Sequence, residues 1–229
     1  GTSNVLMSYM DENYAQDAKD MMINSILYII APLFVGVFTS AMAAYGFARL
    51  RFPGRIPMFF TLLSTILLPG VITMVPSYIM YSVGYGWSNT PLPLIIPGMF
   101  GSAMTMFLIR QYFLGFPKEL EEAAQLDGMG WWGIFVRIAL PLSMPILGTA
   151  TIIQIVSIWN DYLWQQVIMT EPYTIAAGLI EVFNNNREFD TKIPVVYSGY
   201  LIASSPPIVL FVAANKYYIQ GLVGSAIKM

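Results

Sequence analysis

Long apolar stretches alternate with short polar segments along this 229-residue chain. A helix needs roughly 20 mainly apolar residues to cross a hydrocarbon core of about 30 Å, because no water is available there to satisfy open backbone groups. Five stretches meet this requirement, at residues 23–48, 56–83, 92–112, 138–169 and 195–214. The pattern therefore predicts an all-α, polytopic membrane bundle with five visible spans.

Composition agrees with a membrane protein and excludes several other classes. Hydrophobic residues make up 56% of the chain and charged residues 10%, against roughly 25% charged in a soluble domain. Cysteine and histidine are absent, which removes disulfides, thiolate metal sites and the commonest acid–base group. The net charge of −2, without a Lys/Arg-rich run, argues against a nucleic-acid partner. No catalytic, cofactor-binding or metal-binding residue is predicted.

The basic residues predict how the spans are oriented. If the N-terminus is outside, eight of the eleven Lys and Arg residues fall in inner segments, and cytoplasmic loops are enriched in these residues. We therefore expect an outside N-terminus and a cytoplasmic C-terminus. The membrane domain then covers residues 23–214, after an external linker at 1–22 and before a cytoplasmic tail at 215–229. An external loop is expected at 170–194.

Proline recurs in the expected spans, and an interior proline removes a helical hydrogen bond and kinks the helix. In the second span, Pro69, Gly70 and Pro76 are therefore hinge candidates. Ordinary tolerance of proline in membrane helices is the alternative. The small residues Gly36 and Gly98, in the first and third spans, predict close helix packing.

The cytoplasmic loop at 114–137 is polar where the rest of the chain is apolar. Pro117 suits the first position of a helix, and Glu119 and Glu121 complement its dipole. Gly128 suits the left-handed residue that ends a helix. The predicted helix of about eleven residues, roughly 16 Å, is too short to span a bilayer. It either docks on another protein or joins two spans along the membrane surface.

The order Glu122-Ala123-Ala124, Gly128 and Ile138-x-Leu140-Pro141 resembles the EAA loop of ATP-binding-cassette (ABC) importer permeases. The resemblance extends over nearly the whole chain and points to the carbohydrate branch, especially the second permease subunit of maltose-type systems. It implies the type I ABC importer permease fold, which usually has six spans. A helix before residue 1 would supply the sixth span and the export signal; a natural five-span form is the alternative.

The resemblance also implies partners and a coupling site. In this family the short helix sits in a cleft of a separate cytoplasmic ATPase, of which two copies are expected, beside a homologous permease and an extracytoplasmic solute-binding protein. No G-x-x-x-x-G-K-[ST] phosphate loop occurs in the chain. ATP and Mg are therefore expected on the ATPase, and this subunit is not expected to be an enzyme. The implied ATPase-coupling residues are Glu121, Glu122, Ala123, Ala124, Leu126, Asp127 and Gly128.

Asp161 is the one acidic residue well inside an expected span. A carboxylate is costly in lipid, so it should face the bundle or water. We take Trp159, Asn160, Asp161 and Tyr162 as translocation-path candidates, with Trp164 as a further ring that could stack on a sugar. Packing or interfacial anchoring is the alternative for these aromatic residues.

The expected function is import of a sugar or oligosaccharide into the cytoplasm. Permeases for other solutes, such as glycerol phosphate or a polyamine, are an alternative within the same class. A proton-coupled secondary carrier that uses Asp161 is an alternative from another class. A lone acid without an intramembrane basic partner makes a poor proton relay, which counts against the carrier.

Overall fold

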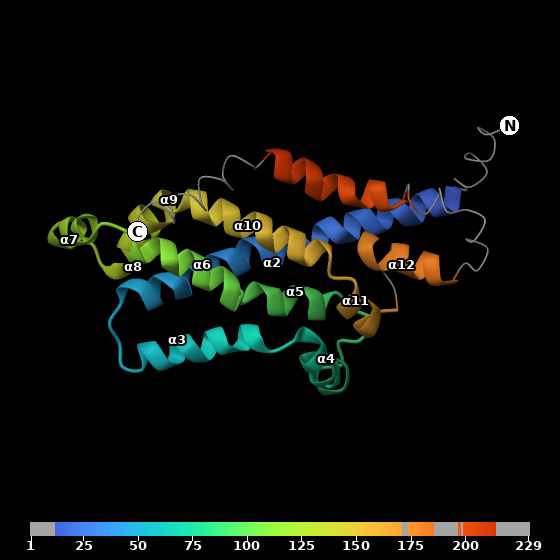
Figure 1. Ribbon diagram of the computed structural model, residues 1–229, viewed down its shortest axis with the longest axis horizontal. Coiled ribbons are helices and arrows are strands. Elements are labelled where there is room, and N and C mark those ends of the chain that lie inside the picture. Colours follow the sequence, from blue (N-terminus) through green and yellow to red (C-terminus); the bar gives the residue numbers. More distant parts are fainter. Residues whose placement is uncertain (1–11, 171–173, 186–196, 198, 214–229) are drawn as a thin grey trace.

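The computed structural model describes residues 12–170, 174–185, 197 and 199–213, and within these ranges every regular element is helical. The molecule is elongated, with α2 running along its long axis (Figure 1). The elements up to residue 114 are α2 (Glu12–Arg49), α3 (Arg55–Ser64), the 3-10 turn η1 (Thr65–Leu67), α4 (Gly70–Tyr78), the π-helix η2 (Ile79–Gly84), α5 (Leu92–Met99) and α6 (Ala103–Leu114). They are followed by α7 (Lys118–Leu126), α8 (Trp131–Ile134), the π-helix η3 (Phe135–Ala139), α9 (Leu140–Leu142), α10 (Met144–Trp159), α11 (Leu163–Ile168), α12 (Ile175–Asn185) and a last helix, Gly199–Ala213.

The helix α2 is longer than the sequence predicted. It begins at Glu12, not near residue 23, and its 38 residues extend about 57 Å at 1.5 Å per residue. The described part of the expected linker at 1–22 is therefore helical. The rest of that linker, the expected tail at 215–229 and much of the expected loop at 170–194 lie outside the described residues.

Small residues let α5 and α6 approach α2 closely. A Cβ atom on Gly36 would collide with the carbonyl oxygen of Gly98 and lie 2.8 Å from Gln154 Nε2. A Cβ on Gly98 would lie 2.7 Å from Pro32 Cβ. Where the backbones meet, Thr39 Oγ1 donates to the Met99 carbonyl at 2.9 Å. The close packing predicted from Gly36 and Gly98 is confirmed.

The second expected span is not one continuous helix. The segments Arg55–Leu67 and Gly70–Gly84 meet at an angle of 95°. Leu68 is extended, with φ −79° and ψ 116°, because the ring of Pro69 pushes the preceding residue out of the helical region. Pro69 is the N-cap residue, and α4 begins at Gly70. The chain breaks at the Pro69-Gly70 hinge candidates, whereas Pro76 lies inside α4.

The fourth expected span is also broken. The segments Trp131–Leu142 and Met144–Trp159 meet at 76° around Ser143, which lies between Pro141 and Pro145. The Ser143 hydroxyl donates to the Ala139 carbonyl at 2.7 Å, so this buried hydroxyl has a partner at the break. The helix α10 then ends at Trp159, short of the expected end at residue 169.

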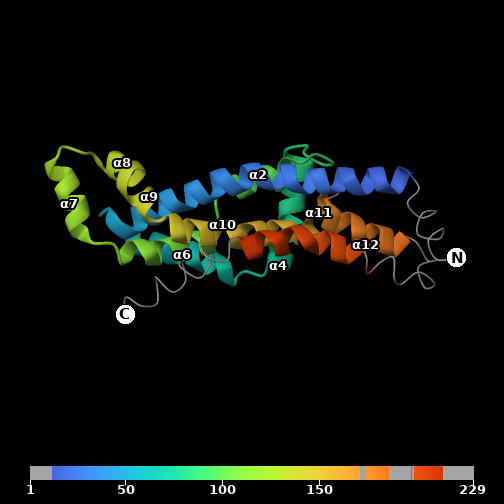
Figure 2. The same ribbon diagram turned by 90° about the horizontal axis from the view of Figure 1, so that it is seen from above.

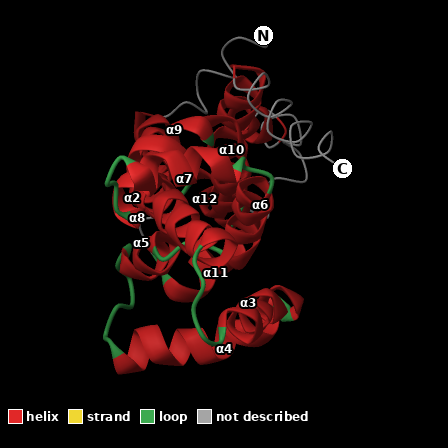
Figure 3. Ribbon diagram, turned by 90° about the vertical axis from the view of Figure 1, so that its left-hand side faces the viewer, coloured by secondary structure: helices red, strands yellow, loops and turns green. Residues whose placement is uncertain are grey.

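The number of spans stays a prediction. Among the described residues, Lys19–Arg49 and Leu92–Leu114 are long and apolar enough to cross a membrane, and each bent pair would add one more span. The helix Gly199–Ala213 is apolar but shorter. Seen end-on in Figure 3, α3 and α4 lie to one side of the other helices, where α3 contacts α6 and α4 contacts α11. Their surface is strongly apolar, with Phe60 of α3 63% exposed and Val71 of α4 67% exposed, as expected of a face that meets lipid or another protein.

We predict that Gly36→Ala destabilises the protein, because the added methyl group meets backbone that cannot move aside. Overpacking of this kind costs about 1–3 kcal/mol. Gly46→Ala is the matched control on the same helix, since nothing lies within 4 Å of a Cβ built there. Thermal unfolding of both variants is measured in detergent. We expect the unfolding midpoint of Gly36→Ala to lie several degrees below that of the wild type, and the midpoint of Gly46→Ala to equal it. Equal midpoints would contradict the packing described here.

Candidate functional site

The short polar helix α7 lies beyond the apolar bundle, past the C-terminal end of α2 (Figure 2). It begins directly after Pro117 and carries Glu119 and Glu121 in its first turn. At its other end Gly128 has φ +82°, and Met129 N–H donates to the Ala124 carbonyl at 2.9 Å. Both the helix and its glycine break are therefore confirmed, although α7 has nine residues and not about eleven.

The two faces of α7 differ sharply in exposure. Glu121 and Ala124 are buried against the rest of the chain, whereas Glu122 and Ala123 are exposed. Leu126 is 90% exposed, an unusual value for a leucine in an ordered helix. Asp127 and Gly128 are exposed as well. Of the seven predicted coupling residues, five therefore face outward and two hold the helix in place.

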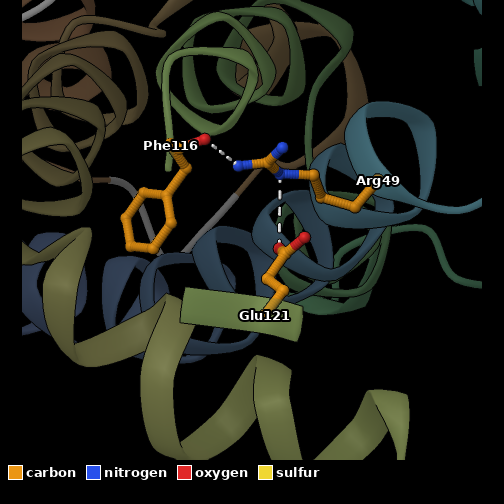
Figure 4. A network of polar contacts seen from close by, with 3 residues as sticks. All are labelled: Arg49, Phe116 and Glu121. Carbon is orange, nitrogen blue, oxygen red and sulfur yellow. Dashed lines mark hydrogen bonds and ion pairs between the residues drawn. The ribbon is translucent and has the colours of Figure 1, made fainter. Parts of the chain in front are cut away.

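A buried ion pair fixes the inner face of α7. Arg49 Nε lies 3.3 Å from Glu121 Oε1, and the two side chains are 6% and 9% exposed (Figure 4). Arg49 Nη2 also donates a hydrogen bond to the carbonyl of Phe116, and its guanidinium lies 6.0 Å from the centre of the Phe116 ring. Arg49 is the last residue of α2, where a cation also complements the helix dipole. One side chain thus joins α2, α7 and the connection before α7.

This ion pair was not predicted from the sequence. The resemblance to the EAA loop placed Glu121 in the partner-facing set, whereas the structure buries it against the chain's own Arg49. The two members are 72 positions apart, and only the packing of α6 beside α2 brings the connection to α7 within reach of Arg49.

Aromatic side chains support the base of α7. Tyr45 packs edge-on against Phe113, with ring centres 5.5 Å apart, and at a tilt against Phe135 at 5.3 Å. Phe113 and Phe135 are fully buried, and such rings supply much of the energy of a core. Trp131 and Trp132, 46% and 60% exposed, lie where the chain returns to the bundle. Ala124 of α7 belongs to the same buried cluster as the tyrosine and phenylalanine rings, so α7 packs on this aromatic core.

Arginines also gather at this end of the bundle. Arg110 lies over the Phe59 ring, 3.9 Å from its centre, and donates from Nε to the Phe47 carbonyl at 3.2 Å. Arg55 Nη1 donates to the Leu50 carbonyl at 3.0 Å. Both arginines thereby satisfy carbonyls near the end of α2 that have no helical partner.

The structure moves Asp161 out of a continuous span and into a break between helices. The helix α10 ends at Trp159 and α11 starts at Leu163, so Asp161 lies in the connection. Its Oδ1 accepts a hydrogen bond from the backbone N–H of Trp164 at 3.4 Å. The expectation that Asp161 lies well inside one helix was wrong, because the predicted span combined two helices.

Two cavities meet at this break. One, of about 240 Å³, is lined by residues of α2, α5, α10, α11 and Thr174. The other, of about 440 Å³, is lined by α4, α5, α11 and Tyr81. Four residues line both cavities: Pro93, Pro97, Asp161 and Trp164.

The other path candidates have different positions. Trp159 lines the smaller cavity and donates from Nε1 to the Ala203 carbonyl at 3.1 Å. Asn160 donates from Nδ2 to the Val156 carbonyl at 2.9 Å. Neither Asn160 nor Tyr162 is among the residues that line the two cavities. In the part of the chain that the structure describes, no three acidic side chains gather as a metal site.

The fold is that of an ABC importer permease. The structure aligns with a chain of a bacterial ABC transporter involved in the import of the acidic polysaccharide alginate, with a TM-score of 0.73. The alignment covers 88% of this chain and 75% of that chain at 24% sequence identity. At this identity the likeness establishes the architecture alone.

Sequence comparison then defines the family. Residues 21–223 match the family model described as "Binding-protein-dependent transport system inner membrane component", and the chain belongs to this family. It is 34% identical to the probable ABC transporter permease YurM of Bacillus subtilis, over 96% of this chain and 75% of the relative. It is also 31% identical to the B. subtilis arabinooligosaccharide permease AraQ, over 90% and 72%. The chain is thus a membrane transport subunit and not an enzyme.

We predict that Glu121→Gln loosens α7 from the bundle, because the buried Arg49 loses its counter-charge. Hydrogen bonds to charged groups contribute about 1.5–3 kcal/mol. Losing this energy would raise the fraction of molecules in which α7 is detached from the bundle by roughly tenfold or more. Trypsin should then cleave at Lys118, the first residue of α7, at a correspondingly higher rate.

The matched control is Glu122→Gln, which makes the same change on the exposed face of the same helix. Its cleavage rate should equal that of the wild type. Equal rates for Glu121→Gln and Glu122→Gln would show that the ion pair does not hold the helix.

Proposed function

We propose that this chain forms half of the translocation pathway of an ATP-driven importer for a sugar or oligosaccharide, and that α7 couples it to a separate ATPase. The main support is the position of α7, which lies beyond the apolar bundle with Glu122, Ala123 and Leu126 exposed while a buried ion pair holds its other face. A rigid helix with an exposed apolar residue suits insertion into a groove of a partner.

Coupling follows from the connection between α7 and α2. When the two ATPase copies bind ATP and Mg and close, they displace α7. Arg49 passes this displacement to α2, which packs against α5 and α6. The bends at Pro69-Gly70 and Ser143 are where the bundle changes direction, and rotation there would open the path alternately to each side.

The end that bears α7 is the cytoplasmic end in this proposal. Arg49, Arg55, Arg110 and Arg137 belong to it, whereas Lys19 lies near the start of α2. This asymmetry is typical of cytoplasmic surfaces. The N-terminal end of α2 would then face the solute-binding protein, and a homologous permease would complete the pathway.

Sugar as the solute is supported by the named functions of relatives. One is the B. subtilis permease MelC for melibiose, raffinose and stachyose, which is 34% identical over 82% of this chain and 68% of its own length. AraQ serves arabinooligosaccharides. Their agreement favours a carbohydrate over glycerol phosphate or a polyamine.

Affinity purification in mild detergent followed by mass spectrometry tests the assembly. We expect an ATPase, a second permease and a solute-binding protein to copurify, and the ligand of the binding protein to be a sugar. Recovery of the chain without an ATPase, under conditions that preserve a known importer, would overturn the proposal.

We predict that Gly128→Val uncouples ATP hydrolysis from uptake. At φ +82° a side chain costs roughly 1–2 kcal/mol or more, so the turn after α7 would rearrange. Open space surrounds a Cβ built at this position, and the effect is therefore one of backbone strain. Proteoliposomes should retain ATP hydrolysis but lose most solute uptake.

Gly130→Val is the control for this experiment. Gly130 has φ −74° and equally open surroundings, so valine fits there without strain. Normal uptake by Gly128→Val, or equal loss by both variants, would count against a coupling role for the turn.

A further inference from the structure

We infer that this subunit itself holds a binding site for a neutral sugar unit, with Asp161 and Trp164 as its recognition residues. The inference rests on the proposed function as a sugar permease and extends it, because a permease can frame a pathway without contacting the solute. The site lies where the two cavities meet, and Asp161 and Trp164 line both.

The dimensions and construction of the site suit a small solute. The two cavities have volumes of about 240 and 440 Å³, and small-molecule sites typically span a few hundred Å³. Their walls come from α2, α4, α5, α10 and α11, and the residues that line both cavities come from α5, α11 and the connection before α11. A solute at the junction would therefore touch α5 and α11 together. A movement of these helices would therefore change the contacts of the bound solute.

Aromatic rings provide a surface for the apolar face of a sugar ring. Tyr81 packs edge-on against Trp164, with ring centres 6.0 Å apart, and stacks on Trp87 at 5.9 Å with the planes 6° apart. Trp164 Nε1 donates to the Pro93 carbonyl at 3.4 Å. These contacts orient Trp164, and a fixed ring loses little conformational entropy when a solute packs on it.

The charges that line the site favour a neutral, hydroxyl-rich solute. Asp161 is an acceptor that can take hydrogen bonds from sugar hydroxyl groups, and bonds to a charged acceptor are strong. Among the residues that the structure describes, no lysine or arginine lines either cavity. In sequence, residues 56–109 contain no charged residue, and residues 138–170 contain Asp161 alone. A solute carboxylate or phosphate would therefore meet a like charge without a counter-ion.

Asp161 also has a local role, as the acceptor for the Trp164 backbone N–H before α11. Asparagine can replace it in that role, because its side-chain oxygen is also a hydrogen-bond acceptor. The substitution Asp161→Asn therefore separates the charge from the hydrogen bond. A purely local role predicts no change in solute selection.

The test uses the complete importer in nanodiscs and saturation-transfer NMR with defined sugars. Lactose and lactobionate form a matched pair that differs by an acid group, and melibiose, raffinose and arabinobiose extend the neutral set. We expect at least one neutral sugar to receive saturation in its ring C–H protons in the wild type, and lactobionate to receive none.

The variants give the decisive comparison. Asp161→Asn should weaken binding of the neutral sugar about tenfold and allow lactobionate to bind, and Trp164→Leu should abolish the ring-proton signal. Asp20→Asn, the same change near the start of α2 and outside both cavities, should behave as the wild type. Saturation transfer that is unchanged in Asp161→Asn and Trp164→Leu, or that is absent from every neutral sugar in the wild type, overturns the inference.

The same preparations distinguish this inference from the function on which it rests. Subunit composition is measured for each sample by mass spectrometry. A chain that fails to assemble with an ATPase refutes the proposed importer. An assembled importer that binds no sugar at this junction leaves the importer standing and refutes the site.

Discussion

The close packing of α2 against α5 and α6 is the interaction on which the rest of the structure depends. Gly36, Gly98 and Gly101 allow the backbones to meet, and polar groups such as Thr39 bond across the contact. Small residues at a helix interface bring van der Waals contacts and hydrogen bonds together where lipid offers no hydrophobic driving force. Because α2 is a single long helix, this contact also fixes where its C-terminal residue, Arg49, lies.

Arg49 in turn connects α2 to α7. A charge at the end of a membrane helix is usually solvated, yet this one is buried and paired with Glu121. Removing two charges from water is costly, and buried pairs are often better explained by geometric specificity than by stability. Here the specificity is mechanical, since the pair sets which face of α7 points outward and connects that face to the core of the bundle.

At the break between α10 and α11 the chain leaves a charge accessible, whereas the end of α2 buries one. The chain stops being helical after Trp159, and Asp161 comes to the junction of two cavities whose walls include Pro93 and Pro97. Irregular backbone at membrane depth is tolerated where it lines a cavity or is buried in protein. The two regions are joined through α2 and α10, which pack against each other, so a movement that begins at α7 has a direct route toward the cavities beside Asp161.

Hydropathy alone determined that the chain is a helical membrane protein, and the Pro117 and Gly128 signals located both ends of α7. These features are local, because span length and helix caps depend on neighbouring residues. The bends at Pro69 and Ser143 were only partly predictable, since proline permits a kink without setting its angle. The Arg49–Glu121 pair and the meeting of Tyr81, Trp164 and Asp161 depend on residues far apart in sequence. Only the packing of helices decides such contacts, because no local pattern records which distant side chains will share one buried space.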